Sequence, residues 1–479
     1  MTVEFHGPWL TLITALPLVA AGVIGTWRST TWRWVGSSLI AGLTLGLAIL
    51  AWIDLNLLGA WSACDAWELI GGTTESPLLI MDEFSAPLVT LAAALYCAVI
   101  FVTPRSKRAR FPFGLTLVSL SFLLAMFCTR DPVLIVGWMA LQTVLPWVEL
   151  RRRKQAASFF MGHQLLSIAL ILVGWFVGQG QTPESVLGIW GVSLIASGLL
   201  IRCGCVPVHC WMIDLFDRVS LGTALLMVAP MAGAYGLVRM VLPIAPDSIL
   251  RGIALVSLVT AVYASGMVLV QTSTRRFYCY LFLSNSSLLL IGLESLTPVG
   301  LTGSLSLWLS IGVALTSFGI IIRAIEGRVG RLALDRFHGL YGQMPLLAGL
   351  FLLALLASIG FPGTIGFVGT ELLIEGALDA YSYSGMLVVL AMAINGIGAL
   401  RAYFKLFTGT TAPATISMQP RINELLTIWA FSLTMIAGGL YPQPGVMMRY
   451  RAVHELLRER AAHFEEMNLS LSHYWEIEE

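Results

Sequence analysis

The sequence predicts an all-α polytopic membrane protein with about 14 transmembrane helices, arranged as two inverted five-helix repeats that each contain a broken helix. Hydrophobic residues make up 57% of the 479 positions and charged residues 11%, whereas charged residues form about 25% of a soluble globular protein. Apolar runs long enough to cross a bilayer recur along most of the chain. Two of these runs are interrupted near their middle by glycine and proline, at Gly204–Pro207 and at Gly360–Gly363.

The expected transmembrane segments follow from the rule that a spanning helix needs about 20 mostly apolar residues. They lie at 8–26, 34–54, 83–103, 112–129, 131–149, 156–178, 187–203, 220–243, 250–271, 277–294, 301–323, 344–378, 383–404 and 422–441. We group them into three N-terminal helices within 1–111, a first five-helix repeat at 112–243, a second at 250–406 and a last helix at 422–441, followed by an amphipathic C-terminal tail at 442–479.

Positive charges alternate between successive loops. Arginine and lysine gather in loops such as 105–110 and 151–154, while the loops between them, such as 54–82 and 179–184, are acidic or neutral. By the positive-inside rule the basic loops face the cytoplasm, which places the N-terminus outside a bacterial inner membrane. An even number of spans puts the C-terminus outside as well. The arginines of the tail (Arg449, Arg451, Arg458, Arg460) favour the opposite side.

Two further features carry alternatives. The tail spaces its leucines as an amphipathic helix does, which fits the bilayer surface or a partner protein, but also a solvated, partly helical end. Cys203, Cys205, His209 and Cys210 crowd at the first interruption, but they lack the second ligand pair typical of a metal site. We therefore expect no metal and no other cofactor. A formal net charge of +1 gives no indication of nucleic-acid binding.

The two interruptions predict the working centre of a transporter. A helix cannot pass through a proline undisturbed, and irregular backbone inside a membrane is tolerated only where protein buries it or where it lines a water-filled cavity. Arg202 precedes the first break, and Glu371 and Glu375 follow the second. Ionisable residues at membrane depth are functional candidates by default. Each break falls in the fourth helix of a group of five, and an odd number of helices reverses the direction of the next group.

Several motifs on these spans resemble the antiporter-like membrane subunits of respiratory complex I, membrane-bound hydrogenases and Mrp-type sodium/proton antiporters, the M-type subunit of complex I above all. The resemblance covers about residues 80 to 445. The motifs are Met81–Pro87, Gly137-Trp138, Ala156–Phe160 with Gln164, Pro207–Trp211 with Asp214, Ala234–Arg239, Gln271-Thr272 with Arg275-Arg276, Phe361–Thr364 with Gly366–Gly369, Arg401–Phe404 and Tyr441–Pro444.

The resemblance implies proton movement along buried charges at mid-membrane depth, through a Glu on span five, Lys on spans seven and eight, a His on span eleven and a Lys or Glu on span twelve. This sequence departs from that pattern. The corresponding positions hold Met139, Arg202, Met231 and a residue near Ser310, and a carboxylate survives only as Glu371, displaced by one residue. Arginine keeps its proton under all ordinary conditions, so Arg202 cannot load and release protons as lysine does.

We therefore expect an antiporter-like membrane subunit of a multi-subunit ion-coupled complex, in which proton translocation is reduced or confined to the second half. Its expected partners are other membrane subunits, a cytoplasmic protein and the lipid bilayer. One alternative is the membrane subunit of a DAB-type inorganic-carbon uptake complex. Another is a non-conducting structural scaffold. The candidates for the ion pathway are Arg202, His209, Asp214, Glu371, Glu375 and Lys405.

For two of these candidates, structural roles compete. His209 lies at a helix start and could serve as a cap, and Glu371 could pair with Lys405 or with backbone donors. Arg323 and Glu326 are expected to form an ion pair at the end of span eleven, because they stand about one helical turn apart.

Overall fold

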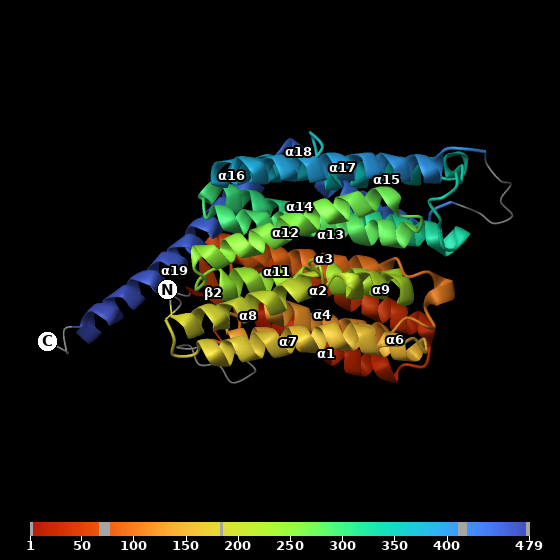
Figure 1. Cartoon of the computed structure of the whole chain (residues 1–479). Coiled ribbons are helices and arrows are strands. Elements are labelled where there is room, and N and C mark those ends of the chain that lie inside the picture. The colour runs from red at the N-terminus through yellow and green to blue at the C-terminus, as the bar shows by residue number, and fades with distance from the viewer. Residues whose placement is uncertain (1–2, 67–76, 183–184, 411–418, 476–479) are drawn as a thin grey trace.

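The structure, a computed structural model, describes residues 3–66, 77–182, 185–410 and 419–475. Long helices run side by side along one common axis (Figure 1). A chain this apolar forms helices because a helix satisfies its backbone groups internally, as hydrocarbon surroundings require. Within the described residues, 11 helical stretches are long and apolar enough to cross a membrane, and three shorter apolar helices accompany them. The protein is therefore an all-helical, multi-span membrane protein.

The first half of the chain supplies the lower part of the bundle in Figure 1. Its helices are α1 (Trp9–Thr26), α2 (Thr30–Leu58), α3 (Ser85–Phe101), η1 (Arg105–Lys107), α4 (Phe113–Phe127), α5 (Pro132–Gln142), α6 (Val144–Arg152), α7 (Ser158–Gly178), α8 (Val186–Cys203), α9 (Cys210–Arg218), α10 (Leu221–Val228), α11 (Ala232–Gly236) and the π-helical turn η2 (Leu237–Val241).

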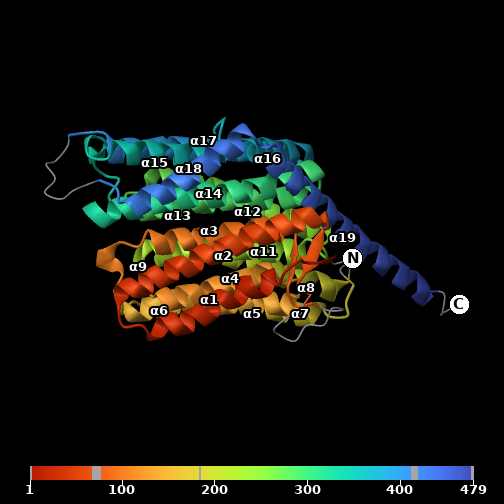
Figure 2. The same ribbon diagram turned by 180° about the vertical axis from the view of Figure 1, so that it is seen from behind.

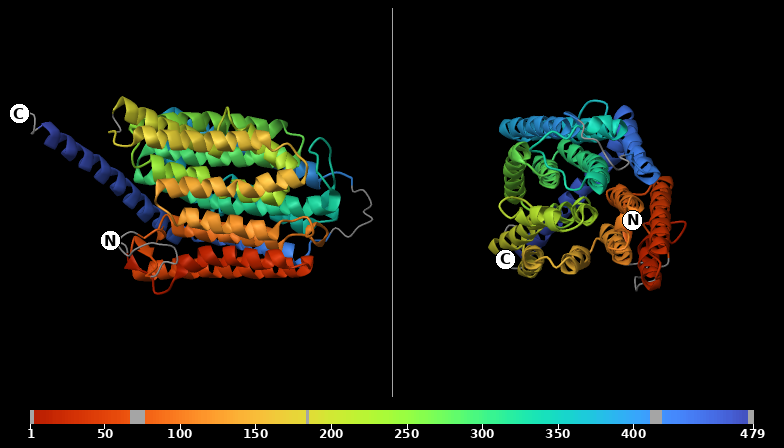
Figure 3. Two further views of the ribbon diagram at one scale, coloured as in Figure 1. Left: turned by 90° about the horizontal axis from the view of Figure 1, so that it is seen from below. Right: turned by 90° about the vertical axis from the view of Figure 1, so that its right-hand side faces the viewer.

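The second half supplies the upper part. Its helices are α12 (Asp247–Val270), α13 (Thr274–Ser295), α14 (Pro298–Val329), η3 (Leu340–Gly342), α15 (Pro345–Ser358), α16 (Gly366–Ala380), α17 (Ser382–Phe407), α18 (Ile422–Leu440) and α19 (Gln443–Trp475). The helices α10, α11, α13 and α14 form the buried centre of the bundle, and α12 lies at its edge in the view along the helix axes (Figure 3). Burial agrees with this arrangement. In the most apolar stretch of each span, 100% of the residues are buried for 221–241 and 89% for 298–329, against 33% for α1 and for α2.

One small sheet departs from the all-helical expectation. Strands β1 (Val3–Glu4), β2 (Ser62–Cys64) and β3 (Ile80–Asp82) pair in that order, β1 parallel to β2 and β2 antiparallel to β3. The sheet ties the N-terminus to the loop between α2 and α3. Cys64, within the loop expected at 54–82, is buried in the middle strand.

Both termini lie at the same end of the bundle (Figures 1 and 2). The tail forms the long helix α19, which crosses this end and then projects beyond it. Its buried arginines are held by the protein and not by a lipid surface. Arg449 donates to the carbonyls of Glu83 and Phe84, and Arg460 donates to those of Leu242 and Ala245. Arg449 and Arg460 therefore fasten α19 to the end of the bundle where the N-terminus lies. Because protein carbonyls hold them, these two arginines do not argue that the tail lies on the other side of the membrane.

Candidate functional site

The first break is closed by its own hydrogen bonds. Helix α8 ends at Cys203 because Gly204 adopts a left-handed conformation with φ 78°, where glycine carries no steric penalty. The carbonyl of Leu200 then accepts from the backbone of Cys205 at 3.0 Å, and the carbonyl of Ile201 accepts from the indole of Trp211 at 2.9 Å. Two of the carbonyls that a helix end leaves free are thus capped by protein and are not offered to an ion.

Arg202 lies in the last turn of α8, and its residue surface is only 6% exposed. One guanidinium nitrogen donates to the side-chain oxygen of Gln164 on α7, and another donates to the carbonyl of Met139 on α5 at 3.0 Å. Neither acceptor is charged. No carboxylate of the described residues forms a salt bridge with Arg202. The positive charge is therefore fixed by neutral dipoles, with no partner that could switch it on and off.

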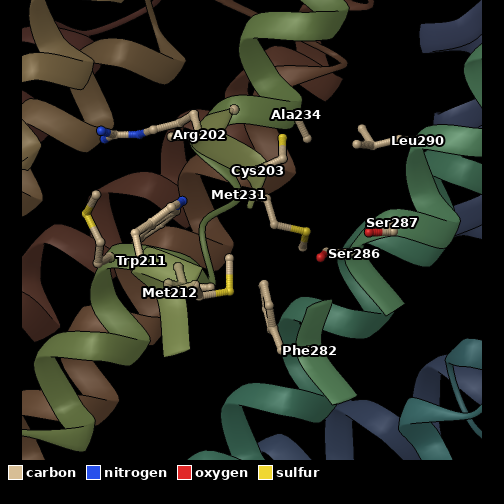
Figure 4. Close-up of a pocket in the computed structure, with 14 residues that line it drawn as sticks. Arg202, Cys203, Trp211, Met212, Met231, Ala234, Phe282, Ser286, Ser287 and Leu290 are labelled. Atoms are coloured by element: carbon tan, nitrogen blue, oxygen red, sulfur yellow. The ribbon is translucent and has the colours of Figure 1, made fainter. Parts of the chain in front are cut away.

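A cavity of about 20 Å³ lies beside the break. That volume holds about one water molecule. Figure 4 shows Met231, Met212, Phe282 and Ser286 around this space, while the guanidinium of Arg202 points away from it. The wall is mostly apolar, and its hydroxyl groups, those of Ser286 and Ser287, both come from α13.

A third interruption, which the sequence analysis did not predict, lies in the span at 221–241. Pro230 separates α10 from α11, and Met231 takes a left-handed backbone conformation with φ 52°. The sequence could have predicted this interruption, because Pro230 lies within an apolar run and proline disturbs a helix. Met231 stands where the resemblance expects a lysine. Ser310, near the expected histidine position, is buried and donates its hydroxyl to the carbonyl of Leu307 on its own helix at 2.8 Å.

The structure separates two other candidates from Arg202. The ring of His209 packs against those of Tyr263 and Tyr280, with centroids 5.2 and 6.1 Å away, and the two tyrosine rings also contact each other. Asp214, on α9, forms a 2.6 Å salt bridge with Arg218 one turn later. Aromatic packing and a local helix pair are common structural arrangements, and among the described residues neither side chain is bonded to Arg202.

Glu371 and Glu375 lie on the outer surface of α16, where both are exposed in the isolated chain. Glu371 is nine residues before the end of the helix at Ala380, or roughly 14 Å, which is close to the middle of a hydrocarbon core about 30 Å thick. Neither carboxylate has a hydrogen bond or a salt bridge to another described residue. Lys405, at the far end of α17, lies 4.1 Å from the ring centroid of Phe337, so the pairing of Glu371 with Lys405 is not formed within the chain.

The second break is partly open to the outside. Helix α15 ends at Ser358, and Phe361 to Gly363 are exposed before α16 begins at Gly366. Its inner side is docked on α18, since the backbone of Ile365 donates to the carbonyl of Met435 at 2.9 Å. Irregular backbone at membrane depth requires cover. Both the break and the carboxylates of α16 are exposed in the isolated chain.

A buried ion-pair network joins two motifs to which the sequence analysis had given no role. Asp82 in β3 is fully buried and contacts Arg239 of η2 at 2.5 Å and Arg130 at 3.0 Å. Arg239 also donates to the hydroxyl of Tyr235 at 3.3 Å. Asp82 and Arg239 were recognisable only as parts of separate motifs, and nothing in their spacing indicated that they meet.

The expected pair between Arg323 and Glu326 is wrong. Arg323 instead donates to the carbonyl of Val99 at 2.7 Å and to the hydroxyl of Thr103 at 2.9 Å, both at the end of α3. Glu326 accepts from Arg275 of α13 at 2.7 Å. Both side chains thus tie α14 to neighbouring helices, which is a stronger constraint on the bundle than a pair within one helix.

Cys203, Cys205, His209 and Cys210 do not assemble a metal site. Cys205 is buried while Cys210 is exposed, and the described residues contain no group of three or more His, Cys, Asp or Glu side chains that could hold a metal ion.

The model of the family described as NADH:quinone oxidoreductase/Mrp antiporter, transmembrane region, matches residues 133–395. The chain is 26% identical to NAD(P)H-quinone oxidoreductase chain 4 1 of Nostoc sp., over 92% of this chain and 89% of the relative. It is 24% identical to NADH-ubiquinone oxidoreductase chain 4 of Marchantia polymorpha, over 78% and 81%.

Solved structures share the fold. A chain of respiratory complex I from Thermus thermophilus superposes with a TM-score of 0.83 and 20% identity, covering 94% of this chain and 99% of that chain. A chain of the Mrp complex from Dietzia sp. gives the same TM-score with 19% identity, covering 94% and 97%. A chain of the archaeal membrane-bound sulfane sulfur reductase gives 0.82 with 18% identity, covering 95% and 99%.

Proposed function

The chain belongs to the NADH:quinone oxidoreductase/Mrp antiporter family of membrane proteins. From that premise we propose that it is an antiporter-like subunit of a multi-subunit membrane complex, and that the first half of this chain conducts no protons. The environment of Arg202 carries this proposal. A proton relay needs a group that loads and releases a proton near neutral pH. Arg202 does neither, and it is held by the neutral Gln164 side chain and the Met139 carbonyl.

The proposed fold has two inverted repeats, at 112–243 and 250–406, between three N-terminal helices within 1–111 and a last span at 422–441. The matching position of the breaks supports it. The pair α8 and α9 stands fourth in the first group, and the pair α15 and α16 stands fourth in the second. With the two halves of each broken helix taken together, the chain crosses the membrane about 14 times, with the N-terminus outside a bacterial inner membrane.

The proposed site of any residual proton passage is the outer face of α16. Ionisable groups at membrane depth nearly always face protein or water and not lipid. Glu371 and Glu375 are exposed and unpaired in the isolated chain, and so is the second break. A neighbouring membrane subunit seated on α16 would bury all three features and complete a path between the two chains. The relatives are chains of quinone oxidoreductases by name, which gives no support to the inorganic-carbon alternative.

Proton flux in the assembled complex, purified from its native membrane and reconstituted in vesicles, tests the proposal. Arg202→Met should leave flux unchanged, and Glu371→Gln should remove most of it. Asp379→Asn, which changes an exposed carboxylate near the end of the same helix, serves as the matched control. Each variant must first be shown to assemble.

The outcomes separate the alternatives. Loss of flux in an assembled Arg202→Met complex would refute the closed first half. Unchanged flux in Glu371→Gln would instead favour the non-conducting scaffold.

A further inference from the structure

An apolar groove of about 540 Å³ runs along the outside of the bundle between α2, α3, α14 and α18. These helices lie together in the rear view (Figure 2). The volume is within the range of ligand pockets, roughly 300–1,000 Å³. Its wall extends along α3 from Pro87 to Phe101, a length of roughly 20 Å. One leaflet of the hydrocarbon core is about 15 Å deep, so the groove is long enough for the acyl chain of a lipid.

The threonine hydroxyls of the groove are bonded to their own helices, and the buried indole nitrogen of Trp52 is the wall's polar atom without a hydrogen-bond partner among the described residues. The three threonines of the wall, Thr90, Thr427 and Thr434, each donate their hydroxyl to the carbonyl four residues earlier, at 3.1, 2.8 and 3.0 Å. Their methyl groups are what remains for an occupant. The rest of the wall is mostly aliphatic and aromatic, with Leu91 from α3 and Phe431 from α18 among its residues. A water-filled or sugar-binding groove would present free hydroxyls, and this one favours hydrocarbon.

Three arginines gather at one end of the groove. Arg105 and Arg108 follow α3, and Arg421 directly precedes α18. The two segments touch, because the side-chain amide of Asn423 donates to the carbonyl of Phe101 at 3.2 Å. Partial burial, followed by repulsion from Arg105 and Arg421, lowers the pKa of Arg108. Among the described residues no carboxylate pairs with any of the three, so this end carries an uncompensated positive charge.

An aromatic stack connects the charged end to the groove. The guanidinium of Arg108 lies 3.5 Å from the ring centroid of Trp34, and Trp34 in turn stacks on Phe101 at 6.2 Å. Phe101 is itself part of the groove wall. Tryptophan prefers the boundary between the hydrocarbon core and the headgroups, which places this stack at headgroup depth.

We propose that this groove binds one anionic phospholipid, with an acyl chain along α3 and α18 and the phosphate on Arg105, Arg108 and Arg421. The arrangement of an apolar channel that ends in unpaired arginines matches the two parts of such a lipid. A basic pocket between transmembrane helices is the usual form of a lipid headgroup site. A partner's transmembrane helix would fill the channel but would leave the three positive charges without an anion.

Native mass spectrometry of the full chain, released from nanodiscs that contain equal amounts of phosphatidylglycerol and phosphatidylcholine, tests the proposal. The wild type should retain one phosphatidylglycerol in preference to phosphatidylcholine. Changing Arg105, Arg108 and Arg421 to Gln should lower that preference by roughly fivefold for each arginine removed. Changing Arg151, Arg152 and Lys154 to Gln removes the same charge from another basic loop and should leave the preference unchanged.

A groove-filling variant keeps the test independent of the arginines. Ala430→Phe puts a ring into the channel wall and should reduce the retention of both lipids without unfolding the protein, since Ala430 is exposed. An equal loss of the preference for phosphatidylglycerol in the groove-arginine variant and in the control-loop variant would overturn the proposal, because it would indicate a general attraction between basic loops and anionic lipid. A photo-crosslinker placed at position 430 in the native membrane that captures a protein and no lipid would overturn it as well.

Discussion

The carboxylate of Asp82 lies 2.5 Å from the guanidinium of Arg239, although 157 positions separate the two residues in the sequence. The pair joins the strand before α3 to the end of the span at 221–241, and Arg130 adds the turn between α4 and α5. Arg239 also lies 4.8 Å from the ring centroid of Phe84. Three segments of the first half are therefore fastened at the end where α19 crosses the bundle.

Replacing Asp82 with Asn should destabilise the protein strongly, because Arg130 and Arg239 would lose their negatively charged partner in a buried site. Removing one partner of a buried ion pair costs about 3–5 kcal/mol. The free energy of unfolding in detergent measures the effect. Asp335→Asn, a change at an exposed carboxylate, should alter it by less than about 0.5 kcal/mol. An Asp82 variant as stable as that control would show that the network contributes nothing.

The same pair predicts how stability depends on pH. Burial would raise the pKa of Asp82, but Arg239 and Arg130 outweigh burial and hold it at about 2, below the ordinary value of 3.8. Because the folded pKa is the lower one, the contribution is complete above about pH 4 and is lost as the pH falls toward 2. It amounts to about 2 kcal/mol. The difference in unfolding free energy between wild type and Asp82→Asn should therefore shrink toward pH 2, and a constant difference would contradict the assignment.

The sequence predicted the parts of this fold that local physics determines. Apolar length predicted the spans, and proline with glycine predicted the breaks at Pro207 and Pro362. The structure has an additional break at Pro230, a residue of the same kind that was passed over inside a continuous apolar run. The partners of Asp82, Arg323 and Glu326 were not predictable, because each is decided by which helices pack together. Spacing within one helix indicated a pair of Arg323 with Glu326, and packing against α3 and α13 gave each a different partner.

Helices α14 and α16 approach so closely that alanine has no room at their contact. A Cβ on Gly303 would lie 2.4 Å from the backbone nitrogen of Leu373, and one on Gly376 would lie 2.3 Å from the Cα of Gly300. Small residues permit this approach in membrane bundles. Gly303→Ala and Gly376→Ala should each destabilise the protein by about 1–3 kcal/mol, because backbone must shift.

The control for this contact is Gly349→Ala on α15, where a Cβ would meet nothing within 4 Å. Alanine is the better helix former, so the control should be neutral or slightly stabilising. Thermal unfolding of the three variants in the same detergent makes the comparison. Equal melting temperatures for all three would indicate that α14 and α16 separate at no cost.

The clamp at Arg449 should govern how firmly α19 is held. Its side chain is 1% exposed and donates to the carbonyls of Glu83 and Phe84 at 2.5 and 3.1 Å. Arg449→Met removes both hydrogen bonds and leaves two carbonyls unsatisfied. Amide hydrogen exchange in the first turns of α19 should become faster. Arg458→Met, at a side chain that is 82% exposed, should leave the exchange unchanged, and equal acceleration in both would show that the clamp is not specific.

Arg202 should tolerate methionine better than lysine, although lysine preserves the charge. The guanidinium reaches two acceptors, Gln164 and the carbonyl of Met139, that come from different helices. A lysine ammonium is a point charge without that planar fork, so it keeps the cost of burying a charge and loses one of the two hydrogen bonds. Methionine is similarly long and needs no partner, and replacing a buried charge with an apolar side chain is often neutral. The unfolding free energies in detergent should therefore rank Arg202→Lys below Arg202→Met. The reverse order would mean that the protein requires a positive charge at this position. That result would contradict the proposal that the charge of Arg202 has no part in function.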